Sequence, residues 1–429
     1  MRNQHQLAAS VAALFATSLV ITGCSGTDSA SEGGEDGEIT LTMAWWGNDT
    51  RSANTEAIIE AFQEEHPNVT IEPSYTDYGS YWDRLATQVA AGDTPDIMQF
   101  DEPYLTTYVD QGVLLDLTDY DIDTSAIPDA TLDAGIIDGR LYTLASGVAT
   151  YAIYLNPAIF EQAGIPVPDD PNWTWDEFED TAVQLSEAGA GDYYGFASSF
   201  GFDEGSIRLW ARQHGETLYT EDGGIGVSPE TMESYFAFTA DMIANGGSPS
   251  AATLSEGQGV GLSETFFATG SVGMGSFWNS QLTAVTDAVG NDLVMLPVPE
   301  SVNDYFLKPA ANWVGSAQTE HPEVVAEFID FMVNSEAQAD IQGTERGIPN
   351  NEDIREYLAP QLTPQDQAAI EFLDVVTFGS AAPATPPGGN QTLSILPRYT
   401  QEVIFETSTP AEAAAGFLDE LQTALDDAQ

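Results

Sequence analysis

The chain has 429 residues, 42% of them apolar and 10% aromatic, which is enough for about two to three domains with hydrophobic cores. Its charge is one-sided, because 68 acidic residues face 10 basic ones and give a formal net charge of −58. A surface of that charge repels phosphate backbones and anionic headgroups, so we expect no nucleic-acid partner and no charge-driven membrane binding. We interpret the acidity as a surface adaptation for solubility or salt tolerance rather than as a cation-binding feature.

The N-terminus has the pattern of an export signal. A basic start precedes an uncharged apolar run at 7–21, which is too short to span a membrane comfortably. The run leads into residues 21–24, ITGC, which resemble the cleavage box of a bacterial lipoprotein signal. Residues 1–23 would then be the signal peptide, and Cys24 would carry lipid. The alternative is an ordinary secretory signal followed by a free thiol, but Cys24 is the only cysteine and an exported free thiol is a liability.

Residues 24–38 contain no side chain large enough to pack in a core and are predicted to be a flexible tether. The folded part then starts near Glu38. Nothing after residue 21 is apolar enough to span a bilayer. The sequence therefore predicts an extracytoplasmic protein that is attached to the cell membrane only through its lipid anchor.

Predicted strands and helices alternate from the start of the folded part. Strands are predicted at 39–43, 68–74 and 95–100, and helices at 55–66 and 78–91. This alternation predicts an α/β fold with a parallel, helix-covered sheet. Ligands of such sheets bind beyond the carboxyl ends of the strands.

The later segments continue the pattern. Strands are predicted at 140–144, 149–155, 272–277, 292–298 and 311–318. Helices are predicted at 157–163 and 175–187, ending at 266–269, at 322–334, and over most of the chain after 349, with a stiff loop at 381–389. The segments 292–298 and 311–318 are expected to cross between two domains.

Several short motifs occur in the order found in one protein family. They lie at 91–97, 111–117, 138–142, 154–156, 174–177, 266–274 and 346–349. With the signal before them, they make the chain resemble the carbohydrate-binding lipoproteins of bacterial ABC importers, which are extracellular solute-binding proteins. Residues 78–117 also resemble the subgroup that serves pectin-derived oligosaccharides.

The resemblance implies a two-lobe, periplasmic-binding-protein-like α/β fold with a hinge and a ligand cleft between the lobes. Lobe 1 is predicted to comprise 39–148 and 297–345, and lobe 2 to comprise 149–296 and 346–429. The implied function is to bind a sugar or short oligosaccharide and to deliver it to the permease subunits of an ABC importer. We expect a monomer that has no cofactor, binds no metal and catalyses no reaction.

A sugar site needs flat aromatic side chains for the C–H face of the ring and polar groups for its hydroxyls. Four tryptophans are candidates for stacking, although burial in a core is the alternative for each of them. Trp46 and Trp278 follow predicted strands, Trp313 lies at the second crossing strand, and Trp210 lies in the second lobe.

The polar candidates lie close to these positions. Asp101 and Glu102 follow the third predicted strand and can accept paired hydrogen bonds from hydroxyls. The remaining candidates are a hinge-strand tyrosine, two asparagines beside tryptophans and one arginine: Tyr151, Asn279, Asn312 and Arg346.

A secreted glycoside hydrolase is the main alternative, because paired carboxylates can act as acid and base. The sequence contains no Gly-x-Ser-x-Gly elbow, and its four histidines have no metal-ligand spacing. A nucleotide hydrolase of the P-loop type is excluded, since the single lysine, Lys308, is followed by Pro309.

The charge of the sugar stays open at this stage. The acidic surface disfavours an anionic ligand, whereas three arginines of the chain could attract a uronate locally. These are Arg208, Arg212 and Arg346.

Overall fold

The computed structural model describes residues 37–197, 200–301, 303 and 305–428. The chain divides after Gly37, and every helix and strand described here belongs to the unit Glu38–Gln429. The predicted signal peptide, Cys24 and residues 24–36 of the predicted tether lie outside the described residues. Within the described part, none of the helices combines the length and the apolar character needed to cross a membrane.

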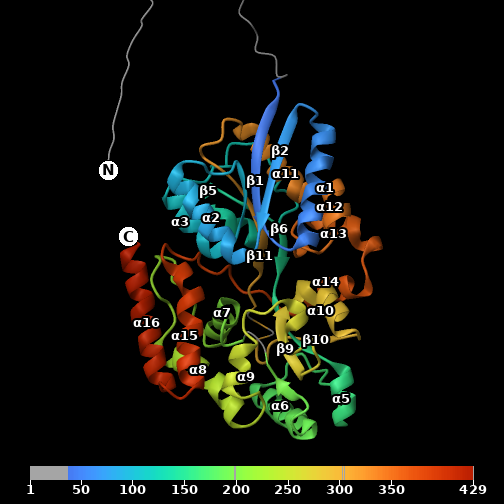
Figure 1. Ribbon diagram of the computed structural model, residues 1–429, viewed down its shortest axis with the longest axis vertical. Helices are drawn as coiled ribbons and strands as arrows, with labels where there is room; N and C mark the ends of the chain where they lie inside the picture. Colours follow the sequence, from blue (N-terminus) through green and yellow to red (C-terminus); the bar gives the residue numbers. More distant parts are fainter. Residues whose placement is uncertain (1–36, 198–199, 302, 304, 429) are drawn as a thin grey trace, which may run out of the picture. The chain divides into compact units, whose positions relative to one another are not determined.

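The first sheet has six strands in the order β12-β6-β11-β3-β1-β2 (Figure 1). Its strands are β1 (Ile39–Trp46), β2 (Val69–Thr76), β3 (Ile97–Phe100), β6 (Leu144–Ala149), β11 (Lys308–Gly315) and β12 (Ile348–Pro349). Strands β2, β1 and β3 are parallel neighbours, while β11 runs antiparallel to both β3 and β6. The predicted parallel sheet is therefore confirmed for its first three strands, and the late strands make it a mixed sheet.

Alternation along the strands divides the side chains between two cores. Leu41, Met43 and Trp45 of β1 pack in one hydrophobic cluster, whereas Ala44 packs in another. The first cluster includes residues of α1 (Asp49–Glu65) and α11 (Pro322–Asn334), and the second includes residues of α2 (Tyr78–Ala91) and α3 (Glu102–Asp110). Because successive side chains of a strand point to opposite faces, each face of the sheet is covered by helices.

The second sheet has four strands in the order β10-β7-β9-β8. They are β7 (Tyr151–Leu155), β8 (Tyr194–Phe196), β9 (Val272–Trp278) and β10 (Val294–Leu296). Strand β7 runs antiparallel to β9, and Tyr151 lies opposite Trp278 in this register. A short hairpin of β4 (Ile136–Ile137) and β5 (Arg140–Leu141) stands apart from both sheets.

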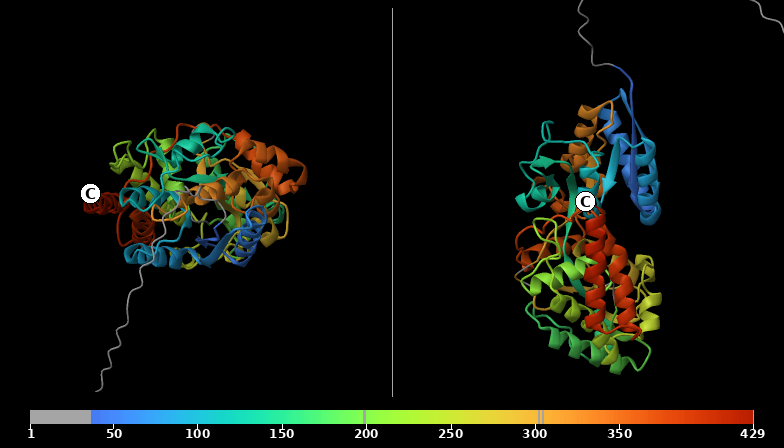
Figure 2. Two further views of the ribbon diagram at one scale, coloured as in Figure 1. Left: turned by 90° about the horizontal axis from the view of Figure 1, so that it is seen from above. Right: turned by 90° about the vertical axis from the view of Figure 1, so that its left-hand side faces the viewer.

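Helices surround the second sheet. Those in its part of the chain are α5 (Pro157–Ala163), α6 (Trp175–Gly189), α7 (Glu204–Gln213), α8 (Pro229–Ala244), α9 (Ala251–Glu256), α10 (Leu282–Val289), α14 (Pro364–Val375), α15 (Thr392–Ile404) and α16 (Pro410–Asp427). The others are α4 (Asp129–Leu132), α12 (Glu336–Gln342) and α13 (Glu352–Leu358). Helices α15 and α16 lie side by side and pack against α8 (Figure 2).

Local sequence explains where several helices begin and end. Thr174 and Glu177 form a capping box at the start of α6, because each side chain accepts a hydrogen bond from the other residue's backbone N–H. Helix α2 ends at Gly92, whose φ of 72° lies in the left-handed region that favours glycine. Helix α1 begins six residues before the predicted start, because the Asn48 side chain accepts from Arg51 N and caps the helix at Asp49.

The chain passes between the two sheets at Thr150, which separates β6 from β7. Thr150 N donates to Asn279 Oδ1 at 2.8 Å, and the Thr150 hydroxyl donates to the Phe306 carbonyl at 3.0 Å. Asn279 N in turn donates to the Thr150 carbonyl at 2.8 Å. Residues before β11 and the segment between α13 and α14 make two further passages, so we infer that these three segments form the hinge.

The sheets favour lobe boundaries that differ from those predicted. Strand β12 pairs with β6 in the six-stranded sheet, whereas Val298, Tyr305 and Phe306 pack in the core of the four-stranded sheet. We therefore propose lobe 1 as 38–149 with 308–358, and lobe 2 as 150–307 with 359–429. The helix predicted to end at 266–269 is wrong, since these residues form turns.

Candidate functional site

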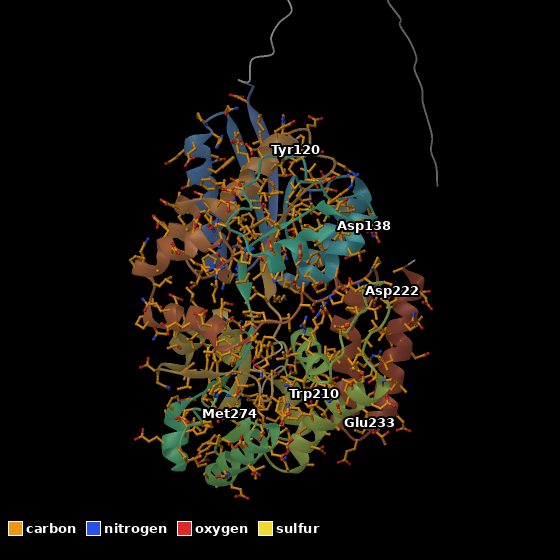
Figure 3. The ribbon with its side chains drawn as sticks, turned by 180° about the vertical axis from the view of Figure 1, so that it is seen from behind. Tyr120, Asp138, Trp210, Asp222, Glu233 and Met274 are labelled. Atoms are coloured by element: carbon orange, nitrogen blue, oxygen red, sulfur yellow. The ribbon has the colours of Figure 1, made fainter. Side chains whose placement is uncertain are left out.

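A cavity of about 660 Å³ is lined by residues from both lobes, that is, from the segments around each of the two sheets. Its size is typical of pockets for small molecules. Figure 3 labels Asp138, which lines it from the β4–β5 turn, and Asp222, whose neighbours Glu221 and Gly223 line it from the second lobe. The lining residues belong to the segments 101–106, 130–138, 203–208, 220–223, 306–309 and 381–387, with Trp278 and Leu393.

Trp278 is the tryptophan of the cavity, and its neighbours fix its ring. A Cβ atom placed on Gly205 would lie 2.8 Å from the indole, so glycine allows the start of α7 to approach the ring closely. Tyr151 meets the ring edge-on, with centroids 4.9 Å apart and planes at 88°. The Trp278 ring is partly exposed and presents an aromatic surface at the cavity wall.

Lys308 and Asp101 form an ion pair at the same wall. Lys308 Nζ lies 3.3 Å from Asp101 Oδ1 and 5.2 Å from the centroid of the Trp278 ring. Asp101 also caps α3 by accepting from Glu102 N at 3.0 Å, and it accepts from the Tyr78 hydroxyl at 3.1 Å. Burial lowers the pKa of Lys308, but the carboxylates of Asp101, Glu204 and Glu102 outweigh burial and raise it. Lys308 is therefore protonated at neutral pH.

Arg208 joins three segments of the cavity wall. Arg208 Nη2 lies 2.6 Å from Glu204 Oε1 in its own helix and 3.2 Å from Glu102 Oε2 at the start of α3. It also donates to Thr385 Oγ1 at 2.6 Å, and Thr385 N donates to Glu102 Oε1 at 2.9 Å. The guanidinium thus connects lobe 1, lobe 2 and the 381–389 loop.

The charges of this network are largely buried. Arg208 is 9% exposed and Glu204 is 7% exposed, and Glu204 Oε2 has no hydrogen-bond partner among the described residues. Burial raises the pKa of the Glu204 carboxyl, although Arg208 opposes this effect. Over the whole lining, seven acidic residues accompany two basic ones, Arg208 and Lys308. The described residues contain no cluster of His, Cys, Asp or Glu suited to a metal ion.

The structure brings some of the predicted site residues together. Asp101, Glu102 and Trp278 line the cavity. Tyr151 lies directly behind Trp278, and its hydroxyl donates to Asp203 Oδ2 at 2.6 Å. Tyr151 and Trp278 also line a second cavity of about 300 Å³.

The other predicted tryptophans do not line either cavity. Trp46 packs among aromatic rings of the first lobe. Its ring centroid lies 5.4 Å from that of Tyr78 and 5.8 Å from that of Trp82. Trp210, labelled in Figure 3, is buried in the core of the second lobe, and its Nε1 donates to Ser234 Oγ at 2.9 Å. Trp313 is 0% exposed, because β11 directs it into the core beneath α11.

The predicted polar residues outside the cavity have structural contacts. Asn279 is 0% exposed; it holds Thr150 and donates from Nδ2 to the Ala369 carbonyl at 2.9 Å. Asn312 is buried in β11. Arg346 is buried in lobe 1, where it donates to the side chains of Gln99 and Thr55 at 2.6 and 2.7 Å. The structure thus places these three residues in the interior instead of at the cavity.

Several residues at the cavity wall have no site role predicted from the sequence. These are Asp203, Glu204, Gly205, Phe306, Lys308 and Thr385. One local signal was available, since Asp203 followed by Ser206 is a pattern that starts a helix, and Asp203 Oδ1 accepts from Ser206 N at 2.9 Å. The Glu102–Arg208–Thr385 contacts join residues far apart in the chain and have no local signal.

This fold, with its cavity lined from two α/β lobes, defines the class of solute-binding proteins. Residues 57–371, more than half of the chain, match the family described as bacterial extracellular solute-binding protein, and the chain belongs to this family. A solved oligogalacturonide binding protein from Yersinia enterocolitica, in complex with saturated digalacturonic acid, has a TM-score of 0.78 at 24% identity. That match covers 91% of this chain and 100% of the other, so the predicted two-lobe fold is confirmed.

Sequence relatives match over shorter stretches. The chain is 27% identical over 205 residues to a protein of Brucella abortus (strain 2308) named as a binding protein, covering 46% of this chain and 48% of that one. It is 24% identical over 231 residues to the arabinooligosaccharide-binding protein of Bacillus subtilis (strain 168), covering 52% and 51%. The chain therefore spans about half the length of the curated relatives it matches.

Proposed function

We propose that this chain captures a sugar or short oligosaccharide outside the cytoplasm and delivers it to the permease subunits of an ABC importer. The observation that carries the proposal is the cavity wall, where Trp278 lies beside Lys308, its partner Asp101 and the Arg208 network. An aromatic plate suits the C–H face of a sugar ring, and charged groups at its edge suit the hydroxyls. The names of the Bacillus and Yersinia proteins support a saccharide ligand.

Calorimetric titration of the purified chain with a panel of oligosaccharides tests this proposal. The panel contains two- to four-unit chains of glucose, galactose, xylose and arabinose. We expect one or more of them to bind with a Kd in the order of micromolar, about −8 kcal/mol. Amino acids and dipeptides serve as the comparison ligands, and saturable binding of these with no response to any saccharide would contradict the proposal.

We further propose that the ligand leaves the protein unchanged. Glu102 and Glu204 are carboxylates of the cavity wall, and both contact Arg208 instead of standing free as an acid and base pair. Long incubation of the purified chain with a bound oligosaccharide should leave its chromatographic profile intact. Steady formation of shorter products would favour the glycoside hydrolase instead.

The anchor is proposed from the sequence alone, since residues 21–24 have the lipoprotein pattern and Cys24 is the only cysteine. The Cys24→Ala variant should lose its lipid and appear in the soluble fraction of the cells or their medium, while the parent stays with the membrane. Equal membrane retention of both proteins would contradict the anchor without affecting the saccharide proposal.

A further inference from the structure

Three arginines were candidates for attracting an acidic sugar. In the structure each of them contacts other groups of the protein. Arg346 donates to Gln99 and Thr55 in the interior of lobe 1. Arg212 donates to the Ser380 carbonyl at 2.7 Å and lies 5.9 Å from the centre of the Phe306 ring. Neither of these two residues lines the cavity.

Arg208 is the one arginine among the described residues of the cavity lining, and two carboxylates already hold it. Glu204 contacts it within α7, and Glu102 contacts it from the other lobe. The Glu102 side chain is 18% exposed and that of Glu204 8%, so water screens these contacts weakly. A ligand carboxylate that pairs with Arg208 would have to share the guanidinium with Glu102 and Glu204 or displace one of them. A displaced Glu204 would lose its ion pair in a buried position, which is costly.

The second cation of the lining has a carboxylate partner as well. Lys308 Nζ lies 3.3 Å from Asp101 Oδ1, and its other side faces the Trp278 ring. With Asp203 also at this wall, the inner cavity has four carboxylates, those of Asp101, Glu102, Asp203 and Glu204, for two cations. An added anion therefore meets an excess of negative charge.

We propose that Glu102 and Glu204 act as a charge filter: by occupying Arg208, they restrict this cavity to saccharides without carboxylates and exclude uronides. The inference rests on the proposed function, because it specifies which saccharides the same site accepts. Glu102 and Glu204 are specificity-determining residues in this view, and Arg208 is a cation that they withhold from the ligand.

Calorimetry with matched ligands tests the filter. Neutral di- and trisaccharides of the panel, including α-1,4-linked galactobiose, are compared with digalacturonic acid, which has the same linkage but carboxylates at C6. In the parent we expect digalacturonic acid to bind at least about tenfold more weakly than the tightest neutral saccharide.

The Glu102→Gln/Glu204→Gln double variant supplies the gain-of-function arm. Glutamine keeps the shape of glutamate and removes its charge, so Arg208 is released to face the ligand. The affinity for digalacturonic acid, relative to the neutral saccharide, should rise about tenfold or more. The Glu102→Gln single variant is measured in parallel and should give a smaller rise, which keeps the test valid if the double variant does not fold.

Glu345→Gln is the matched control. Glu345 also forms a partly buried ion pair with an arginine, with Oε1 2.9 Å from Arg51 Nε, but it does not line the cavity. It should leave the ratio of the two affinities unchanged. The filter is overturned if the parent binds digalacturonic acid as tightly as the best neutral saccharide, or if the folded glutamine variants keep the parental ratio. If no saccharide of either kind binds, the result contradicts both the proposed function and the charge filter that rests on it.

Discussion

Trp278 differs from the other candidate tryptophans in the residues that surround its ring. Gly205 lies against the ring, Tyr151 meets its edge, and Lys308 lies above it, yet the ring remains partly exposed at the cavity. Because the protein's own residues make these contacts and restrict the ring, we expect little side-chain entropy to be lost when a sugar ring stacks there. Trp313 is held by core packing on all sides and has no surface to offer.

Replacing Trp278 with alanine should therefore weaken saccharide binding more than it weakens the fold. A lost stacking contact with its buried area is worth about 1 to 3 kcal/mol, so we expect the Kd to rise about tenfold or more. Calorimetry gives the Kd, and urea denaturation gives the free energy of unfolding.

Trp313→Ala is the control for this substitution at the residue scale. It should lower the free energy of unfolding by about 3 to 5 kcal/mol, because it leaves a cavity in a packed core. The fraction that still folds should bind like the parent. Parental affinity in Trp278→Ala would mean that the ligand occupies another part of the cleft.

At the scale of elements, strands with clear alternation and helices with clear end signals could be predicted from the sequence. Strand β1 alternates between apolar and polar residues, and α2 was predicted with its observed bounds. Strand β6 was not assigned as a separate strand, because LASGVA is buried at all six positions and shows no alternation.

From the sequence, cavity residues could be predicted only where they lie at or just after the end of a strand. Asp101, Glu102 and Trp278, which the rule that ligands bind beyond strand ends had singled out, line the cavity. Trp46 does not line the cavity, because the rule does not say which neighbours cover a side chain beyond the strand, and Tyr78 and Trp82 pack against this one. Contacts such as Arg208 with Glu102 depend on how the lobes meet, which the local pattern does not encode.

Asp366 ties helix α14 to elements of both lobes. Its Oδ1 accepts from Thr283 at 2.6 Å and from Thr344 at 2.7 Å, and its Oδ2 accepts from Thr363 at 2.7 Å. Burial by itself raises the pKa of Asp366, but these hydrogen bonds outweigh burial and hold the pKa below its ordinary value. A carboxyl whose pKa is lower in the folded state stabilises the fold above the unfolded-state pKa, and this contribution is lost as the pH falls through the folded-state pKa.

Asp366→Asn should consequently lower the free energy of unfolding at pH 7 by about 1 to 3 kcal/mol, since the amide accepts fewer hydrogen bonds. The difference from the parent should shrink as the pH falls below the unfolded-state pKa of an aspartate, about 3.9, and should be lost once the pH passes the lower folded-state pKa and the parental carboxyl is protonated. Urea denaturation between pH 3 and pH 7 measures both effects. Asp374→Asn, an exposed change on the same helix, should alter stability by less than about 0.5 kcal/mol, and an equal effect of both variants would contradict the role of Asp366.

At the scale of the whole molecule, the net charge of −58 opposes folding through repulsion among carboxylates. Added salt screens this repulsion, since the Debye length falls from about 10 Å at 0.1 M to about 3 Å at 1 M. We expect the free energy of unfolding to increase between 0.1 and 1 M NaCl, measured by urea denaturation at pH 7. Sucrose at matched osmolality is the control for excluded-solute effects, and stability that falls with NaCl would show that ion pairs outweigh the repulsion.

Ligand binding acts on the whole molecule because the cavity is lined from both lobes. A ligand shifts the equilibrium between open and closed lobes only through contacts that are better in the closed form. A saccharide that touches both walls must dissociate before the protein unfolds. At a free saccharide concentration of about one hundred times Kd, binding should therefore add roughly 2.7 kcal/mol to the free energy of unfolding. In Trp278→Ala at the same saccharide concentration the gain should be smaller, because the Kd is higher.

Thermal and urea unfolding with and without the saccharide identified by calorimetry measure this gain, and small-angle scattering measures the closure. The Glu102–Arg208 contact joins the lobes through protein side chains alone, so we expect part of the closed population to exist before binding. Scattering of the unliganded Glu102→Gln variant should then show a larger radius of gyration than the parent, and the ligand should bring both proteins to the same value. Identical radii for both unliganded proteins would mean that the lobes close through the saccharide alone.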